Sequence, residues 1–230
     1  MSTPALTHTK THLRIGVMLE EVQLSDIVGI DIIGNLANPY VSGVASLDPQ
    51  YTKWTPHALS LQFFYISSTL SPARTTPLQT VPSNPSDLLT GSSFQFVPNT
   101  TYDTCPRDLD ILLIGGPFPS HRPPAADKFM KEAWTKTPVF MTTCVGSLWL
   151  ASTGLLEGKT CTTNKEFLYL AKEMHPGTKW LRQRWVVDEK EYEGDDGRKG
   201  ELWTAGGAGA GEFSRISHRY LMLTLNLHRH

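Results

Sequence analysis

Short apolar segments of strand length alternate along this chain with segments whose apolar residues recur at helical spacing. The strand-length segments are residues 13–19, 59–66, 94–97, 109–114, 138–142, 159–162, 185–188 and 202–205. Helical spacing is found in residues 26–38, 125–135, 148–154 and 165–174. Because the two kinds of segment alternate, the sequence predicts an α/β fold, a three-layer sandwich around a mostly parallel, doubly wound sheet.

The connections carry weaker signals. Residues 39–57 show no clear period and are expected to be an irregular connection with at most a short helix. Residues 67–87 are dense in Pro, Ser and Thr, which indicates a hairpin or edge strands. The charged segment 189–201 is predicted to be the tip of a hairpin. We expect one domain over residues 12–230, after a mobile N-terminal lead at 1–11 and ending in a short, atypical tail at 214–230.

The composition and charge of the chain argue against several classes of protein. The chain has 230 residues, of which 40% are hydrophobic and 19% charged, so one sizeable core is expected. A formal net charge of −1 argues against a nucleic-acid binder. No apolar run has the length of a membrane helix, and the N-terminus lacks the apolar core of a signal peptide. These features predict a cytoplasmic protein that does not associate with membranes.

The junction after residues 138–142 is the strongest candidate for chemistry. A strand-length segment there runs into Thr143, Cys144 and Val145, and a helical segment follows at once. A thiol on an abrupt strand-to-helix turn has the layout of a nucleophile elbow. The positive end of a helix lowers the pKa of a nearby cysteine and favours the thiolate. Cys144 is therefore the predicted nucleophile, whereas Cys105 and Cys161 are predicted to be structural.

Two further groups are expected near this thiol. Gly115 and Gly116 follow the apolar strand 109–114, and loops after neighbouring parallel strands meet at one crevice. The N–H groups of Gly116 and Val145 could then converge on one developing oxyanion. Acidic side chains follow the first strand, and any of them could exchange a proton with the thiol: Glu20, Glu21 and Asp26.

Other motifs give little support for a cofactor or a metal. The eight histidines show no HxH or HExxH spacing, and the three cysteines form no CxxC pair. His121 is a possible but disfavoured partner for Cys144. The Gly-rich segment 206–211 lacks the surroundings of a dinucleotide or phosphate loop. The sequence therefore predicts neither a bound cofactor nor a metal site.

Five segments together resemble the ThiJ/PfpI (DJ-1-like) family, which has the class I glutamine-amidotransferase-like fold. They are RIGVMLEEVQLSDIVGIDIIG, DILLIGGPFP, FMTTCVGSLWLASTGLLEGKTCTTN, RWVVDE and LWTAGGAGAGEF. The resemblance extends over about residues 12–213 and is most similar to the isonitrile-hydratase-like branch. It implies a flavodoxin-like α/β domain and a homodimer.

The resemblance also implies roles for single residues. Cys144 matches the reactive cysteine of the family, and Asp26 matches the acid that hydrogen-bonds it, which selects Asp26 over the two glutamates. Gly116 and Val145 match the two backbone donors beside the thiol. The usual proline four positions after the acid is Ile30 here.

Three departures affect the expected activity. Val145 stands where isonitrile hydratases often have threonine. Asn164 ends the segment Thr162-Thr163-Asn164 where many relatives have Thr-Thr-His, so the family histidine is absent. Gly211-Glu212-Phe213 replaces the usual start of the last helix and leads into a basic tail.

The predicted activity is a cofactor-independent hydration of a small isonitrile to an N-substituted formamide. The Cys144 thiolate would attack the terminal carbon, and Asp26 would handle the proton. Two alternatives remain at this stage. One is glyoxalase-like or small-amide hydrolase chemistry, and the other is a redox or stress sensor that uses Cys144 without turnover.

Overall fold

The computed structural model describes residues 11–74 and 95–207. Residues 1–10, 75–94 and 208–230 lie outside the described residues. The predictions for the N-terminal lead, for most of the Gly-rich segment and for the C-terminal tail therefore fall outside them, as does part of the Pro-rich connection.

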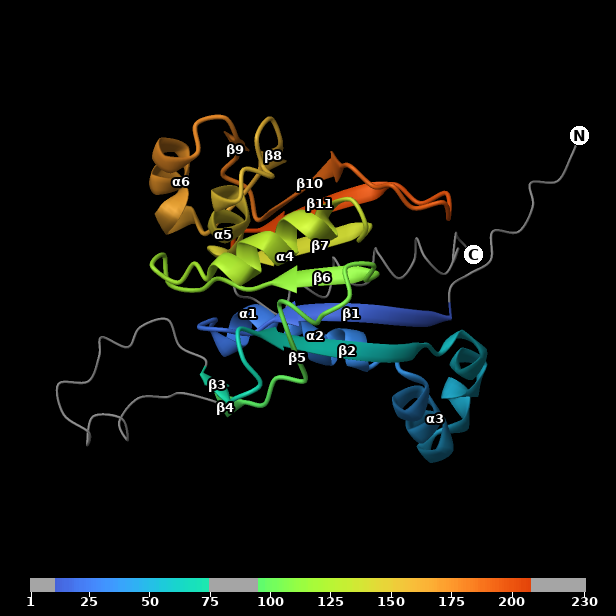
Figure 1. The fold of residues 1–230 in the computed structure, drawn as a ribbon. Helices are drawn as coiled ribbons and strands as arrows, with labels where there is room; N and C mark the ends of the chain where they lie inside the picture. Colours follow the sequence, from blue (N-terminus) through green and yellow to red (C-terminus); the bar gives the residue numbers. More distant parts are fainter. Residues whose placement is uncertain (1–10, 75–94, 208–230) are drawn as a thin grey trace, which may run out of the picture.

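Seven strands form the central sheet, in the order β10-β11-β7-β6-β1-β2-β5 (Figure 1). Their bounds are β1 His12–Met18, β2 Ser60–Ser67, β5 Thr100–Thr101, β6 Ile111–Ile114, β7 Val139–Thr143, β10 Trp185–Lys190 and β11 Gly200–Ala205. All neighbours in the sheet pair in parallel except β10 and β11, which form an antiparallel hairpin. The fold is thus the predicted α/β sandwich with a mostly parallel sheet.

The helices and two small sheets complete the described fold. The α-helices are α1 Leu24–Ile27, α2 Gly29–Gly34, α3 Asn38–Leu47, α4 Pro124–Trp134, α5 Gly146–Ser152 and α6 Leu168–Met174. The 3₁₀ helices are η1 Pro49–His57 and η3 Lys165–Phe167. β3 Ala73–Arg74 pairs with β4 Gln95–Phe96, and β8 Thr160–Cys161 pairs with β9 Lys179–Trp180. No helix in the described ranges is long and apolar enough to cross a membrane.

Alternate residues of the central strands point into two separate cores, as the pleat of a strand requires. On one face, Leu112 and Phe140 pack with residues of α4 and α5. On the other face, Leu113 and Met141 share a core with Ile27 and Ile33, which come from α1 and α2. Because both faces of the strands are covered, their sequences are continuously apolar and lack polar alternation.

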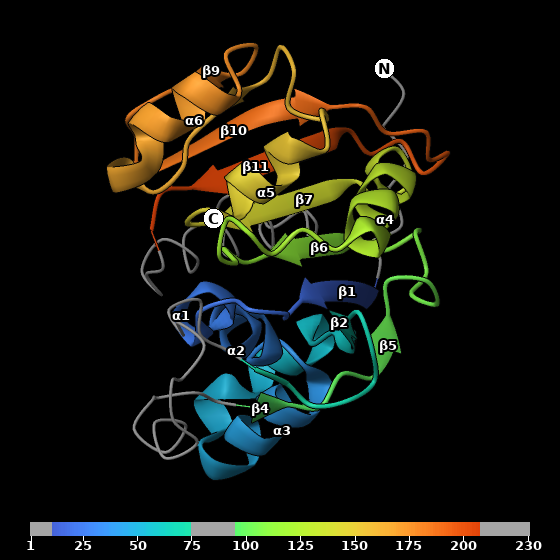
Figure 2. The ribbon, with the colours of Figure 1, turned by 60° about the vertical axis from the view of Figure 1, so that its left-hand side comes forward.

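The sheet brings the loops after β1, β6 and β7 to one edge. Parallel strands deliver their carboxyl ends to the same side, which is the left-hand side for β1 and β6 in Figure 1. In the rotated view α6 and β9 lie near β10 at one end of the sheet, and α3 lies at the other end, beyond β2 (Figure 2). The segments that follow β1, β6 and β7, in the middle of the sheet, carry the candidate site residues.

Residues 39–57 differ from the sequence prediction, because they are helical through most of their length in α3 and η1. Pro39 stands in the first turn of α3, and the Asp48 side chain accepts a hydrogen bond from the Gln50 N–H at the start of η1. Neither helix contains a fully buried residue. A helix that buries no continuous face has no strong apolar period, so the pattern did not reveal it.

The helix predicted over residues 26–38 also differs in detail. The helix begins earlier than the apolar spacing predicted, because α1 starts at Leu24 after the N-cap residue Gln23. The single predicted helix is divided into α1 and α2 at Val28. Asp26 lies in the first turn of α1.

Replacing Phe129 by alanine should strongly destabilise the fold. Its ring is fully buried in α4 and packs against Tyr102, with ring centroids 6.1 Å apart. Losing a buried phenylalanine side chain costs about 3–5 kcal/mol. Urea denaturation should show this loss, whereas Phe118→Ala, at a half-exposed position, should lose much less. Equal losses in the two variants would contradict the placement of the core.

Candidate active site

Cys144 occupies a sharp turn between β7 and α5. Its φ is +53°, in the left-handed region that side-chain-bearing residues seldom adopt. Val145 is the N-cap of α5, and the helix begins at Gly146. A methyl group at Gly146 would overlap the carbonyl oxygens of Ile114 and Gly115, so glycine lets α5 start directly against the end of β6. The predicted nucleophile elbow is therefore present in the backbone.

Asp26 is fully buried at the same edge of the sheet. Its Oδ2 accepts a hydrogen bond of 2.9 Å from the Gly116 N–H, and its backbone carbonyl accepts one of 2.9 Å from the Thr143 hydroxyl. Its Oδ1 has no hydrogen-bond partner among the described residues. Burial raises the pKa of Asp26 to about 6, although the bond from Gly116 acts in the opposite direction. The carboxyl group can therefore change its charge near neutral pH.

The Cys144 sulfur has two N–H donors. Asn164 Nδ2 donates to Sγ over 3.3 Å, and the Val145 N–H also hydrogen-bonds the thiol. Burial and the neighbouring Asp26 charge nevertheless raise the pKa of Cys144, and the two donors only partly oppose them. The expectation of a resting thiolate is therefore wrong: the first turn of α5 does not outweigh burial beside a carboxylate.

Gly116 and Val145 lie next to each other in the site, but their N–H groups have different partners. A methyl group at Gly116 would lie 2.9 Å from Val145 N and 3.1 Å from Asp26 Oδ2. The Gly116 N–H donates to Asp26, and the Val145 N–H donates to the sulfur. This arrangement differs from the predicted convergence of both groups on one oxyanion.

The other acids and His121 have different surroundings. Glu20 accepts a hydrogen bond of 2.7 Å from the Ser68 hydroxyl and lies 3.4 Å from His121 Nε2. These partners lower the pKa of Glu20 to about 2, although burial acts to raise it. The His121 ring packs edge-on against Trp149, with centroids 5.8 Å apart. No contact between His121 and Cys144 is found within the described part of the chain, so the histidine dyad has no support.

Sequence reasoning did not include Asn164 in the site. The sequence marked this position only as one that lacks the family histidine. Asn164 also caps η3, because its Oδ1 accepts a hydrogen bond of 3.1 Å from the Glu166 N–H. The signal that could have identified the residue was its place directly after Thr162 and Thr163 in the family-like segment.

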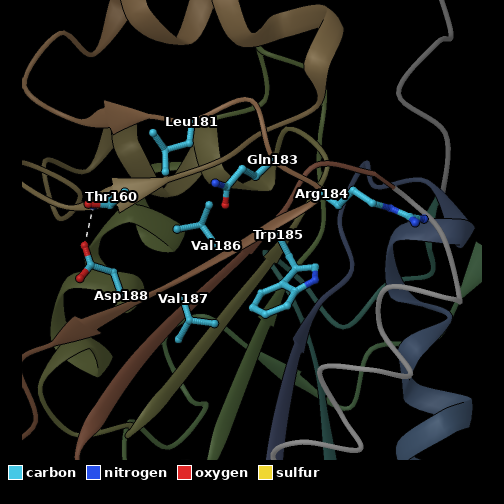
Figure 3. A pocket seen from close by; sticks show the side chains of 8 residues that line it. All are labelled: Thr160, Leu181, Gln183, Arg184, Trp185, Val186, Val187 and Asp188. Atoms are coloured by element: carbon cyan, nitrogen blue, oxygen red, sulfur yellow. Dashed lines mark hydrogen bonds between the residues drawn. The ribbon is translucent and has the colours of Figure 1, made fainter.

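A cleft of about 680 Å³ lies between β10 and the residues beside it from β8 and from the segment after β9 (Figure 3). It is lined by Thr160, Leu181, Gln183, Arg184, Trp185, Val186, Val187 and Asp188. None of the predicted site residues lines it, so it is separate from the thiol.

All three cysteines are free and buried. Burial is the main reason why the pKa values of Cys105 and Cys161 are each raised to about 12, which fits the prediction that they are structural. No group of three or more His, Cys, Asp or Glu side chains that could hold a metal ion is found in the described ranges.

Comparison with known proteins agrees with this geometry. A sequence model of the DJ-1/PfpI family matches residues 61–194. The chain belongs to the DJ-1/PfpI family. Members of this family are often cysteine-dependent enzymes or stress sensors. No curated protein matches the sequence.

Solved structures show the same fold at low sequence identity. A ThiJ/PfpI family protein from Pseudomonas syringae has a TM-score of 0.60 at 15% identity, covering 98% of this chain and 79% of that one. DJ-1 from Schizosaccharomyces pombe has a TM-score of 0.58 at 14% identity, with 94% and 96% covered. An AraC family transcriptional regulator from Pseudomonas putida has a TM-score of 0.60 at 15% identity, with 92% of each chain covered. These likenesses concern the fold alone.

The backbone at Cys144 can be tested by two substitutions that both remove the thiol. Glycine adopts a φ of +53° freely, whereas alanine does so at a cost of about 1–2 kcal/mol. Cys144→Gly should therefore be more stable than Cys144→Ala by about 1 kcal/mol. Urea denaturation measures this difference, and an alanine variant at least as stable as the glycine variant would refute a left-handed Cys144.

Asp26→Asn should change the pH dependence of stability. The pKa of the native Asp26 is raised from 3.8 to about 6, so the folded state binds more protons than the unfolded state between these values. Asp26 therefore destabilises the fold progressively as pH rises from about 4 to 6, by up to about 3 kcal/mol. The free energy of unfolding of Asp26→Asn, relative to wild type, should be greater at pH 7.5 than at pH 4.5. A difference independent of pH would show that Asp26 is not perturbed.

Proposed function

We propose that this protein is a cofactor-independent cysteine enzyme that hydrates small isonitriles to N-substituted formamides. The observation that carries the proposal is the hydrogen bond from the Gly116 N–H to Asp26. It holds a titratable carboxyl group beside the thiol and also removes one of the two backbone donors that an oxyanion would need. The site therefore has a carboxyl group for proton transfer but lacks the second free N–H donor that would stabilise an oxyanion.

The chemistry follows from this arrangement. Around neutral pH Asp26 is largely ionised, and the raised pKa of Cys144 keeps the sulfur protonated. The carboxylate can therefore take the thiol proton as the sulfur attacks the terminal isonitrile carbon. A carbon–sulfur bond forms, and the same carbon receives the proton from Asp26, giving a thioimidate. Water then adds across the C=N bond. Cleavage of the carbon–sulfur bond releases the formamide and restores the thiol.

Attack on an aldehyde or an amide carbonyl is less well supported. Such attack produces an oxyanion, which enzymes usually stabilise with two positioned donors. Here the Val145 N–H is the backbone donor at the sulfur, and the Gly116 N–H is engaged by Asp26. Attack on an isonitrile carbon places the developing charge on carbon, where an acid neutralises it directly.

A redox sensor is also less well supported. Oxidation-sensitive cysteines have a low pKa and are accessible to solvent. Cys144 is only 8% exposed, and burial beside Asp26 raises its pKa. The homodimer is part of the proposal on the family resemblance alone, and the cytoplasmic location remains the prediction made from the sequence.

The proposal is tested by turnover of an alkyl isonitrile, methylglyoxal and a small amide by the full chain. We expect formamide from the isonitrile, complete loss of this activity in Cys144→Ala and retention in Cys105→Ala, which removes a buried thiol elsewhere in the fold. Isonitrile turnover that persists in Cys144→Ala would overturn the mechanism. Turnover of methylglyoxal or the amide without the isonitrile would replace the proposal by the alternative enzyme. The sensor would be favoured by no turnover together with selective oxidation of Cys144.

A further inference from the structure

The Asn164 amide is held from both of its ends. Oδ1 accepts a hydrogen bond of 3.1 Å from the Glu166 N–H, and Nδ2 donates to Cys144 Sγ over 3.3 Å. Turning the amide over would place an NH₂ group against the Glu166 N–H, so two donors would face each other. The helix cap therefore fixes which end of the amide faces the sulfur.

The two residues before Asn164 are also tied to the structure around the elbow. The Thr162 N–H donates to the Thr204 hydroxyl over 2.8 Å, and the Thr162 hydroxyl donates to the Gln183 carbonyl over 2.9 Å. The Thr163 hydroxyl donates to the backbone carbonyl of Cys144 itself over 3.0 Å. Both threonines are buried. Asn164 thus approaches the thiol on a segment whose position is fixed at consecutive residues.

We propose that Asn164 is a catalytic residue whose Nδ2–H stabilises the negative charge on the Cys144 sulfur as the thiol gives up its proton. A hydrogen bond to a charged group contributes more than one to a neutral group, so the bond strengthens as the sulfur becomes anionic. An amide neither gains nor loses a proton near neutral pH. Asn164 therefore promotes ionisation without receiving the proton, which goes to Asp26, whose Oδ1 has no hydrogen-bond partner among the described residues.

This assignment explains how the site works with an amide at the position where a histidine was expected from the family resemblance. A histidine could both donate to the sulfur and accept its proton. Asn164 retains the first ability and lacks the second, so the thiol depends on the carboxyl group for proton transfer. The inference concerns the reactivity of the sulfur and holds whichever electrophile is the substrate.

The test is the pH dependence of Cys144 alkylation by iodoacetamide in the full chain, followed by peptide mass spectrometry. Serine and aspartate at position 164 both keep a side-chain oxygen to cap Glu166, and neither carries the amide donor. Asn164→Ser should shift the alkylation profile to higher pH and lower the rate at pH 8 about tenfold. Asn164→Asp should lower it further, because its charge opposes the thiolate. Both variants should keep the wild-type unfolding midpoint.

Two comparisons decide the outcome. Asn35→Asp adds the same charge at an exposed position and should leave the alkylation profile unchanged. A wild-type alkylation profile in Asn164→Ser would overturn the inference, even if Asn164→Asp reacts slowly, because charge repulsion alone would then explain the slow reaction. The assay uses no isonitrile, so its result is independent of the proposed hydratase activity.

Discussion

The buried carboxyl group of Asp26 is the feature on which the rest of the site depends. It reaches from α1, which follows β1, to the Gly116 N–H after β6, while the backbone carbonyl of Asp26 accepts a hydrogen bond from the hydroxyl of Thr143 at the end of β7. The helix after β1, the loop after β6 and the end of β7 are thus joined around one acid. The same contacts place the carboxyl group beside Cys144, where its charge raises the pKa of the thiol. Structure and proton transfer therefore rely on one side chain.

The site gathers several features that are unfavourable for stability. Cys144 has a left-handed backbone, Asp26 is buried beside a thiol, and Oδ1 of Asp26 has no hydrogen-bond partner among the described residues. Each of these costs free energy, and such features persist only where the surrounding structure imposes them. Here the two cores of the sheet hold the strand ends, and Gly146 lets α5 begin against β6. This concentration of strain supports a functional role for the elbow.

Much of the fold could be predicted from sequence because its strongest signals are local. The continuous apolar strands at 109–114 and 138–142 and the helix after Pro124 were predicted close to their observed bounds. The α3 and η1 helices were missed because they bury no continuous face. The order of the strands depends on contacts between distant residues, which no local pattern contains.

Within the site, the elbow was predicted from the abrupt change of period at Cys144, and the choice of Asp26 depended on a family resemblance. Two properties could not be predicted. The protonation state of the Cys144 thiol depends on the balance between burial, the Asp26 charge and two N–H donors. The contact of Asn164 with the sulfur depends on how the segment after β8 packs against the elbow, 20 residues away in sequence.

The most direct test of the central claim is to look for the covalent intermediate on Cys144. The full chain would be mixed with an alkyl isonitrile, quenched within the first turnover and digested for peptide mass spectrometry. We expect an adduct with the mass of the intact isonitrile on the Cys144 peptide, which disappears as formamide accumulates. Formamide production without any adduct on Cys144, or with an adduct that never decays, would contradict it.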